Sequence, residues 1–201
     1  MMCIACGGWS TPRVCARCER SIRPAPDRSI DGVVVRSAFV HDGAARRLVH
    51  RVKYEGSRLA SHQLATAMAP LVPPCDVVVP IPRVTIRRWM IGADGGGMLA
   101  EAVAGLVARP VEQWLRSPIW QAPHAGRSRD RRRSPRLRGT RRHRAMTAVL
   151  VDDVVTTGAT IASALAAIRS TGGDPGSVVG VVCATSAARV TSVYRVPGPR
   201  E

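Results

Sequence analysis

The chain has 201 residues and a formal net charge of +16, with 45% hydrophobic and only 3% aromatic residues. This length suits one domain of ordinary size plus a small additional module. No apolar stretch reaches the ~18–20 residues needed to span a bilayer, and the first residues lack the charged and apolar regions of a signal peptide. We therefore expect a soluble cytoplasmic protein without membrane insertion. The few aromatic residues do not indicate a strong stacking platform for single-stranded nucleic acid.

Four cysteines at the start of the chain follow the pattern Cys-x2-Cys-x8-Cys-x2-Cys, and they are Cys3, Cys6, Cys15 and Cys18. Two such pairs on short turns can bring four thiolates to the corners of a tetrahedron around Zn²⁺. Four protein ligands would close the coordination sphere, so the zinc would be structural. A redox pair or disulfides are the alternatives, and a cytoplasmic location disfavours disulfides. We predict a zinc module over residues 1–22.

The rest of the chain alternates strand and helix patterns. Residues 23–31 contain two prolines and are expected to be a linker to a domain over residues 32–196, followed by a flexible tail over residues 197–201. Strands are predicted over 33–40, 76–82, 148–151 and 178–184, and helices over 44–54, 59–71, 95–107 and from 161 onward. This alternation predicts an α/β fold with a parallel sheet and right-handed crossovers.

Positive charge is concentrated in residues 127–144, where ten arginines and one acid, Asp130, give a net charge of +9. One interpretation is a solvated loop in an arginine-rich protein. The other is a segment that neutralises the phosphates of a polyanion. In the second interpretation, Arg131, Arg132 and Arg133 are candidate nucleic-acid contacts.

Residues 148–160 are the most informative stretch. Four apolar residues, 148–151, predict a buried parallel strand that ends at two adjacent acids, Asp152 and Asp153. A loop of small hydroxyl residues and glycine covers residues 156–160. Apolar residues then recur with helical spacing, at Ile161, Ala164, Leu165 and Ile168. In an open α/β sheet, this junction between the end of a strand and the start of a helix is where ligands bind.

The chemistry of this junction favours a phosphorylated sugar. The first N–H groups and the positive dipole end of the helix attract a phosphate. Gly158 lets the backbone approach that phosphate closely, and threonine hydroxyls add donors. Two carboxylates can accept hydrogen bonds from sugar hydroxyls or hold Mg²⁺ through water. The alternative is a strand–turn–helix with incidental acids, but paired carboxylates at a strand end are costly unless something positive binds there.

These residues resemble the ribose-phosphate motif of type I phosphoribosyltransferases, which binds phosphoribosyl pyrophosphate. The resemblance implies that Asp152 and Asp153 hold the ribose hydroxyls at the catalytic centre. It implies that the loop holds the 5′-phosphate, through Thr156, Thr157, Gly158, Ala159 and Thr160. The turn that contains Pro82 and Arg83 would face the pyrophosphate.

The whole chain is similar to the ComF family, phosphoribosyltransferase-like proteins associated with bacterial competence and DNA uptake. The shared features are the four-cysteine module, Lys53-Tyr54 after a helix, the strand end Val-Pro-Ile-Pro at 79–82, and the motif at 149–160. The resemblance implies a type I phosphoribosyltransferase-like fold with a small N-terminal zinc-ribbon-like module. It also implies Mg²⁺-dependent transfer of phosphoribose to a nitrogen acceptor. The alternative function is non-catalytic or weakly catalytic handling of single-stranded DNA, with RNA as a further possible ligand.

The chain departs from that family after the Pro-x-Pro strand end. The family usually shows Arg-Gly-Phe-Asn or Arg-Gly-Phe-Asp, and this chain has Ile91-Gly92-Ala93-Asp94 in the corresponding place. An arginine there could pair with pyrophosphate through two hydrogen bonds, which isoleucine cannot do. Arg87 and Arg88 are the nearest substitutes in the sequence. The family's following loop carries an asparagine, and this chain contains none.

Overall fold

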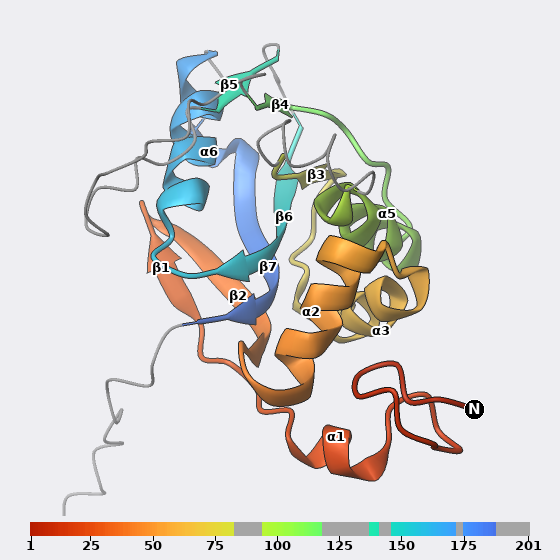
Figure 1. The fold of residues 1–201 in the computed structure, drawn as a ribbon. Helices are drawn as coiled ribbons and strands as arrows, with labels where there is room; N and C mark the ends of the chain where they lie inside the picture. The colour runs from red at the N-terminus through yellow and green to blue at the C-terminus, as the bar shows by residue number, and fades with distance from the viewer. Residues whose placement is uncertain (83–93, 118–136, 141–145, 172–174, 188–201) are drawn as a thin grey trace, which may run out of the picture.

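A computed structural model of the chain describes residues 1–82, 94–117, 137–140, 146–171 and 175–187. Its centre is a five-stranded sheet in which four strands run parallel and the first is an antiparallel edge strand (Figure 1). In sheet order the strands are β1 (Arg28–Ile30), β2 (Val33–Val40), β7 (Val178–Ser186), β6 (Ala148–Val155) and β3 (Val77–Pro80). The predicted fold class is confirmed: an α/β fold with a mostly parallel sheet, preceded in the sequence by a small four-cysteine module.

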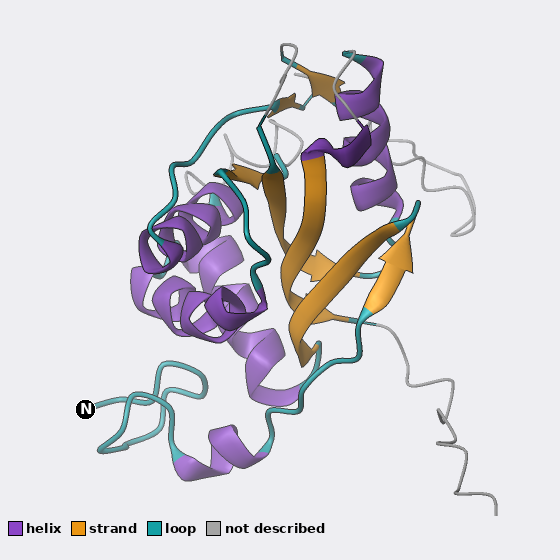
Figure 2. Cartoon of the chain, turned by 180° about the vertical axis from the view of Figure 1, so that it is seen from behind, coloured by secondary structure: helices purple, strands orange, loops and turns teal. Residues whose placement is uncertain are grey.

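Helices cover both faces of the sheet (Figures 1 and 2). One face carries α2 (Gly43–Glu55), α3 (Arg58–Met68) and α5 (Gly95–Val107), and the other carries α6 (Ala159–Ser170). The shorter elements are α1 (Ala16–Arg20), the 3-10 turns η1 (Ala69–Leu71) and η3 (Pro175–Ser177), and the two-residue strands β4 (Leu115–Arg116) and β5 (Arg138–Gly139). Each helix in the described parts of the chain is too short or too polar to span a bilayer.

Strand β6 shows why the sequence reads as a continuous apolar run. Val149 and Val151 belong to the core under α2, α3 and α5, whereas Ala148 and Leu150 belong to the core under α6. All four side chains are fully buried. A parallel strand that is covered on both faces needs apolar residues at every position, not at alternate ones.

The strand that carries the acidic pair is longer than predicted. We expected it to end at residue 151, but β6 continues to Val155 because β7 extends alongside it. Asp152 pairs with Cys183 and Val155 with Ser186, so ladder hydrogen bonding persists past the two acids. The acids therefore lie within a strand, and their side chains follow the alternation of a strand.

The segment predicted as a linker contains strand β1, which forms a hairpin with β2. Ile30 pairs with Val33 across a two-residue turn, in which Asp31 and Gly32 have φ values of 49° and 81°. Two consecutive positive φ angles are the requirement of a type I′ turn, for which Asp-Gly is a favoured sequence. Arg28 and Ile30 of this hairpin reach the loop after β6.

Some of the predictions concern residues outside the described parts of the chain. These residues are Arg83, the three arginines Arg131, Arg132 and Arg133, and the predicted tail at 197–201.

Candidate functional site

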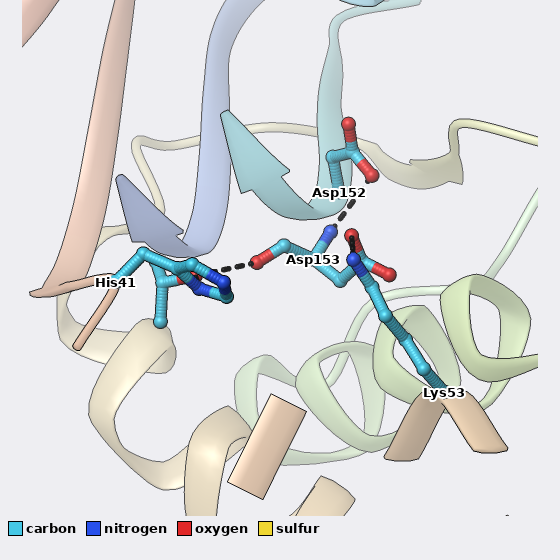
Figure 3. A network of polar contacts seen from close by, with 5 residues as sticks. His41, Lys53, Asp152 and Asp153 are labelled. Carbon is cyan, nitrogen blue, oxygen red and sulfur yellow. Dashed lines mark hydrogen bonds and ion pairs between the residues drawn. The ribbon is translucent and has the colours of Figure 1, made fainter. Parts of the chain in front are cut away.

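The acidic pair is buried near the carboxyl end of β6. Asp152 is 8% exposed and Asp153 is 3% exposed. The carboxylate of Asp152 accepts a hydrogen bond of 2.8 Å from the N–H of Asp153. The two carboxylates point in different directions, as expected for neighbouring residues of a strand (Figure 3). The pair therefore presents acidic oxygens toward two separate regions.

Asp153 is held from the side of helix α2. Its Oδ1 lies 3.0 Å from the Nζ of Lys53, in the last turn of that helix. Its carbonyl accepts a hydrogen bond of 3.3 Å from the hydroxyl of Thr185, whose oxygen lies 2.8 Å from Nδ1 of His41 (Figure 3). Because the hydroxyl proton goes to the carbonyl, the hydrogen between Thr185 and His41 belongs to Nδ1. Asp153 is thus bound through both its side chain and its backbone.

His41 lies just after β2, and its surroundings lower the pKa of its imidazole and so favour the neutral form. Burial lowers the pKa of its imidazole, and the positive charges of Lys53 and Arg46 lower it further, against the opposing effect of Asp42. A neutral imidazole with its hydrogen on Nδ1 fits the donor role that the hydrogen bond to Thr185 requires.

Asp152 lines a small recess together with residues of the loop that follows β6. Gly158 has a φ of 84° and is the N-cap of α6. The positive φ favours glycine, and a Cβ at this position would lie only 2.4 Å from Cδ1 of Ile30, so the end of that side chain would have to move. A small recess here is lined by Asp152, Val154, Val155, Thr156, Gly158, Thr160 and Ile161. Of the predicted residues, the structure brings Asp152, Thr156, Gly158 and Thr160 together.

The other predicted residues of this motif occupy different places. Thr157 accepts a hydrogen bond of 3.4 Å from the N–H of Ala159, the first residue of α6, and neither lines the recess. Asp153 does not line it either, since it faces Lys53.

Two residues of the β1 hairpin complete the loop, and the sequence analysis missed both. Arg28 donates a hydrogen bond of 2.7 Å to the carbonyl oxygen of Thr156, and Ile30 packs over Gly158. The sequence signal that could have located them is the Asp-Gly dipeptide at 31–32, which favours a hairpin just before β2.

Pro82 lies in a separate cleft beside the end of β3. This cleft of about 560 Å³ is bordered by Pro80 and Pro82, by Asp94 at the N-cap of α5, and by Met98 and Glu101 of that helix. A second cavity of about 900 Å³ shares the last three of these residues and extends to Tyr54, just past Lys53 on α2. The cleft is close to β6, because Ile81 donates a backbone hydrogen bond of 2.9 Å to the carbonyl of Val151.

The four N-terminal cysteines form a compact cluster that can hold a metal ion. All four Sγ atoms lie within 4.8 Å of one another, and those of Cys6 and Cys15 are 3.8 Å apart. A tetrahedral zinc–thiolate site, with bonds of about 2.3 Å, places its sulfurs about 3.8 Å apart. The geometry therefore fits one tetrahedral ion.

Backbone and side-chain donors point at the sulfurs of this cluster. Burial raises the pKa of the Cys3 thiol, but backbone N–H donors, including that of Cys15 at 3.3 Å, outweigh burial and bring it to about 6. Burial and the neighbouring thiols raise the pKa of Cys18 to about 12, although the guanidinium of Arg47 lies 3.5 Å from its sulfur. Four crowded thiols cannot all ionise unless a cation joins them, and donors to sulfur are typical of thiolate metal sites.

The cysteine module packs against helix α2. Cys3, Ala5 and Cys18 are buried in the same core cluster as Ala44 and Leu48 of that helix. At the start of α2, the backbone N–H of Ala44 donates to the hydroxyl of Ser21 at 3.1 Å. The same helix therefore contacts the cysteine module near its first turn and Asp153 near its last.

Comparisons with known proteins found similar solved structures. No protein-family model and no curated protein sequence matches this chain. A solved structure that is similar to it is the crystal structure of adenine phosphoribosyltransferase from Thermoanaerobacter pseudethanolicus. The two share 14% sequence identity with a TM-score of 0.43, over 85% of this chain and 98% of the other. The resemblance of this chain to the ComF family stays a prediction.

Proposed function

We propose that this chain binds phosphoribosyl pyrophosphate with Mg²⁺ and transfers its phosphoribosyl group to a nitrogen acceptor. The observation that supports this most is the unit formed by the end of β6, the loop and the start of α6. It combines a buried carboxylate at residue 152, threonines at 156 and 160, and a glycine whose positive φ disfavours any side chain. Such a unit at the carboxyl end of a parallel strand suits a sugar phosphate.

In this proposal the loop binds the 5′-phosphate. The N–H groups in the first turn of α6 and the hydroxyls of Thr156 and Thr160 would donate to its oxygens, assisted by the dipole of a 12-residue helix. Arg28 and Ile30 would keep the loop in this shape, through the hydrogen bond to Thr156 and the packing on Gly158.

The two carboxylates would bind the ribose from different sides, Asp152 from the recess and Asp153 from the side of α2. Ionised carboxylates only accept hydrogen bonds, and the sugar's 2′- and 3′-hydroxyls are matching donors. Carboxylate oxygens also suit Mg²⁺, which when bound with the substrate would neutralise charge on the pyrophosphate. Pro82 borders the cleft next to β6 where the pyrophosphate would leave, and Arg83 follows it in the sequence.

The transfer needs positioning more than proton transfer. The bond between the anomeric carbon and a pyrophosphate oxygen breaks, and the electron pair leaves with pyrophosphate. The lone pair of the acceptor nitrogen forms the new bond to that carbon, and a proton on the nitrogen is lost. As the sugar carbon gains positive charge, the chain's own contribution is to orient the ribose through Asp152 and Asp153 and to exclude water.

The cysteine module would be structural in this proposal. A zinc ion bound by Cys3, Cys6, Cys15 and Cys18 would have no open coordination position, so it would hold residues 1–22 against α2 and take no part in the transfer.

A screen of acceptors tests the proposed activity. The protein would be incubated with phosphoribosyl pyrophosphate, Mg²⁺ and each nucleobase in turn, and pyrophosphate release would be followed. We expect release above the acceptor-free control with at least one base, and none with the Asp152→Asn/Asp153→Asn variant. Equal release from that variant would show that the activity arises elsewhere.

The charge of residues 127–144 supports a second candidate function, binding of single-stranded DNA. Each phosphate neutralised on a single strand contributes a slope of about −0.7 in log affinity against log salt. We expect Arg131→Glu/Arg132→Glu/Arg133→Glu to abolish most DNA binding and flatten this slope. Filter binding over a range of salt concentrations measures it. Salt-independent affinity, or strong preference for one base sequence, would contradict binding through charge.

A further inference from the structure

The pair Lys53–Asp153 differs from the other ion pairs given for the described residues. Its side chains are only 19% and 5% exposed. In the three other pairs, Arg23–Asp42, Arg36–Asp27 and Arg51–Glu55, every side chain is at least 33% exposed. Exposed pairs contribute little, whereas a buried carboxylate that loses its cation is left with a large uncompensated desolvation cost. The ammonium of Lys53 therefore matters to the state of Asp153.

Helix α2 gives Lys53 a fixed position. Its inner face, with Leu48, Val49 and Val52, is fully buried against the sheet. His41, two residues before the helix, reaches Thr185 and through it the carbonyl of Asp153. The last turn of α2 thus contacts Asp153 directly through Lys53, and the segment just before the helix reaches Asp153 indirectly, through His41 and Thr185.

The charge balance of the acidic pair follows from this arrangement. Asp152 and Asp153 are buried neighbours in the sequence, and buried like charges disfavour each other's ionisation. The ammonium at 3.0 Å from Asp153 offsets one of them.

We propose that Lys53 is a positioning residue that serves as a built-in cation for Asp153. It holds this carboxylate ionised and oriented, so that the acidic pair can accept sugar hydroxyls before any Mg²⁺ binds. This inference rests on the proposed function, since it assigns the acidic pair to a sugar ligand. Mg²⁺ would then be required by the pyrophosphate of the substrate, not by the two acids.

Ribose 5-phosphate is the probe that separates these two requirements. It has the sugar hydroxyls and the 5′-phosphate but no pyrophosphate, so any need for Mg²⁺ would come from the protein. Its affinity would be measured by calorimetry with and without Mg²⁺ for the wild type, Lys53→Met and Lys53→Arg. Arg51→Met is the matched control, because Arg51 lies on the same helix but pairs with Glu55 at the surface.

We expect wild-type affinity to change less than threefold with Mg²⁺. Lys53→Met should bind at least tenfold more weakly without Mg²⁺ and recover most of the loss when Mg²⁺ is added, because a metal ion can replace the missing cation. Lys53→Arg should retain more affinity than Lys53→Met, and Arg51→Met should match the wild type. Unchanged affinity in Lys53→Met, or a loss that Mg²⁺ does not reduce, would overturn the proposal.

A second measurement needs no ligand, so its result is independent of the proposed function. Lys53→Met should lower the melting temperature, and adding Asp153→Asn should raise it again, because the second change removes the buried charge that lost its lysine partner. If the double variant melts no higher than Lys53→Met, Lys53 does not balance Asp153 and the proposal fails. If both results hold but no acceptor is ever phosphoribosylated, the proposed activity fails and the role of Lys53 remains.

Discussion

The cysteine module and the unit around β6 are stabilised in different ways. In residues 1–22 the buried residues are few, namely Cys3, Ala5 and Cys18, while Trp9 is 89% exposed. Strand β6 instead has apolar residues buried on both faces, and its loop is fixed by close packing on the hairpin. A segment as short as the module cannot bury a sufficient core of its own. We infer that metal ligation holds the first region and side-chain packing holds the second.

The largest expected effect comes from removing metal ligands. Cys3→Ser/Cys6→Ser should lose bound zinc completely, and residues 1–22 should lose their hydrogen-exchange protection because folding of the module depends on the metal. The α/β domain should stay folded, since its two core clusters consist mainly of residues outside the module.

The control for this variant is Cys75→Ala, because Cys75 is a buried cysteine outside the cluster. It should keep one zinc ion per chain by elemental analysis. If wild-type protein purified without chelator contains no zinc, the difference in stabilisation between the two regions is wrong.

Adding a single methyl group at Gly158 should destabilise the loop after β6. Gly158→Ala places a side chain at a φ of 84° and displaces the end of Ile30, so the backbone strain should lower the free energy of unfolding by about 1–3 kcal/mol. Gly105→Ala is the matched control: Gly105 lies inside α5, a Cβ added there would meet no atom within 4 Å, and the variant should gain about 0.5–1 kcal/mol. Urea unfolding measures both. A Gly158→Ala variant as stable as the wild type would mean that the loop is not held in this backbone conformation.

The smallest expected effect concerns pH. Because the pKa of His41 is lowered in the folded state, the unfolded chain binds more protons there as the pH falls below about 6.5. Stability from this group is therefore complete above that pH and is lost as the pH falls through the folded pKa. His41→Gln should show a smaller loss of urea stability between about pH 7.5 and pH 5.5 than the wild type. An unchanged pH dependence would mean that His41 does not stay neutral.

Much of the fold could be predicted because local patterns determined it. Strand β2 and helix α5 have the predicted bounds, since apolar spacing and end signals such as the Asp94 cap, which accepts from Gly97 N–H at 3.2 Å, lie within each segment. The extent of β6 could not be predicted in this way. Its last four residues are a strand because β7 pairs with them, and that pairing joins residues about thirty positions apart in the sequence.

The candidate site was predicted in its loop but not in its surroundings. Residues 152–160 contain their own strand, turn and helix signals, whereas Lys53 is one hundred positions from Asp153 and meets it only through the sheet order. Asp152 and Asp153 face different sides because both lie within strand β6. The sequence analysis ended this strand at residue 151, so it did not predict that the two side chains point apart. The hairpin residue Ile30 was missed because the Asp-Gly turn after it was taken as part of a linker.

Calorimetry with phosphoribosyl pyrophosphate and Mg²⁺ tests the central claim most directly, by comparing the wild type with Asp152→Asn/Asp153→Asn. The account predicts binding to the wild type and at least tenfold weaker binding to the double variant, a loss of about 1.4 kcal/mol. The melting temperature without ligand should be measured in parallel, to establish that the variant is folded. Equal affinity of the two proteins, with both folded, would contradict the assignment of β6 and its loop as a phosphoribosyl site.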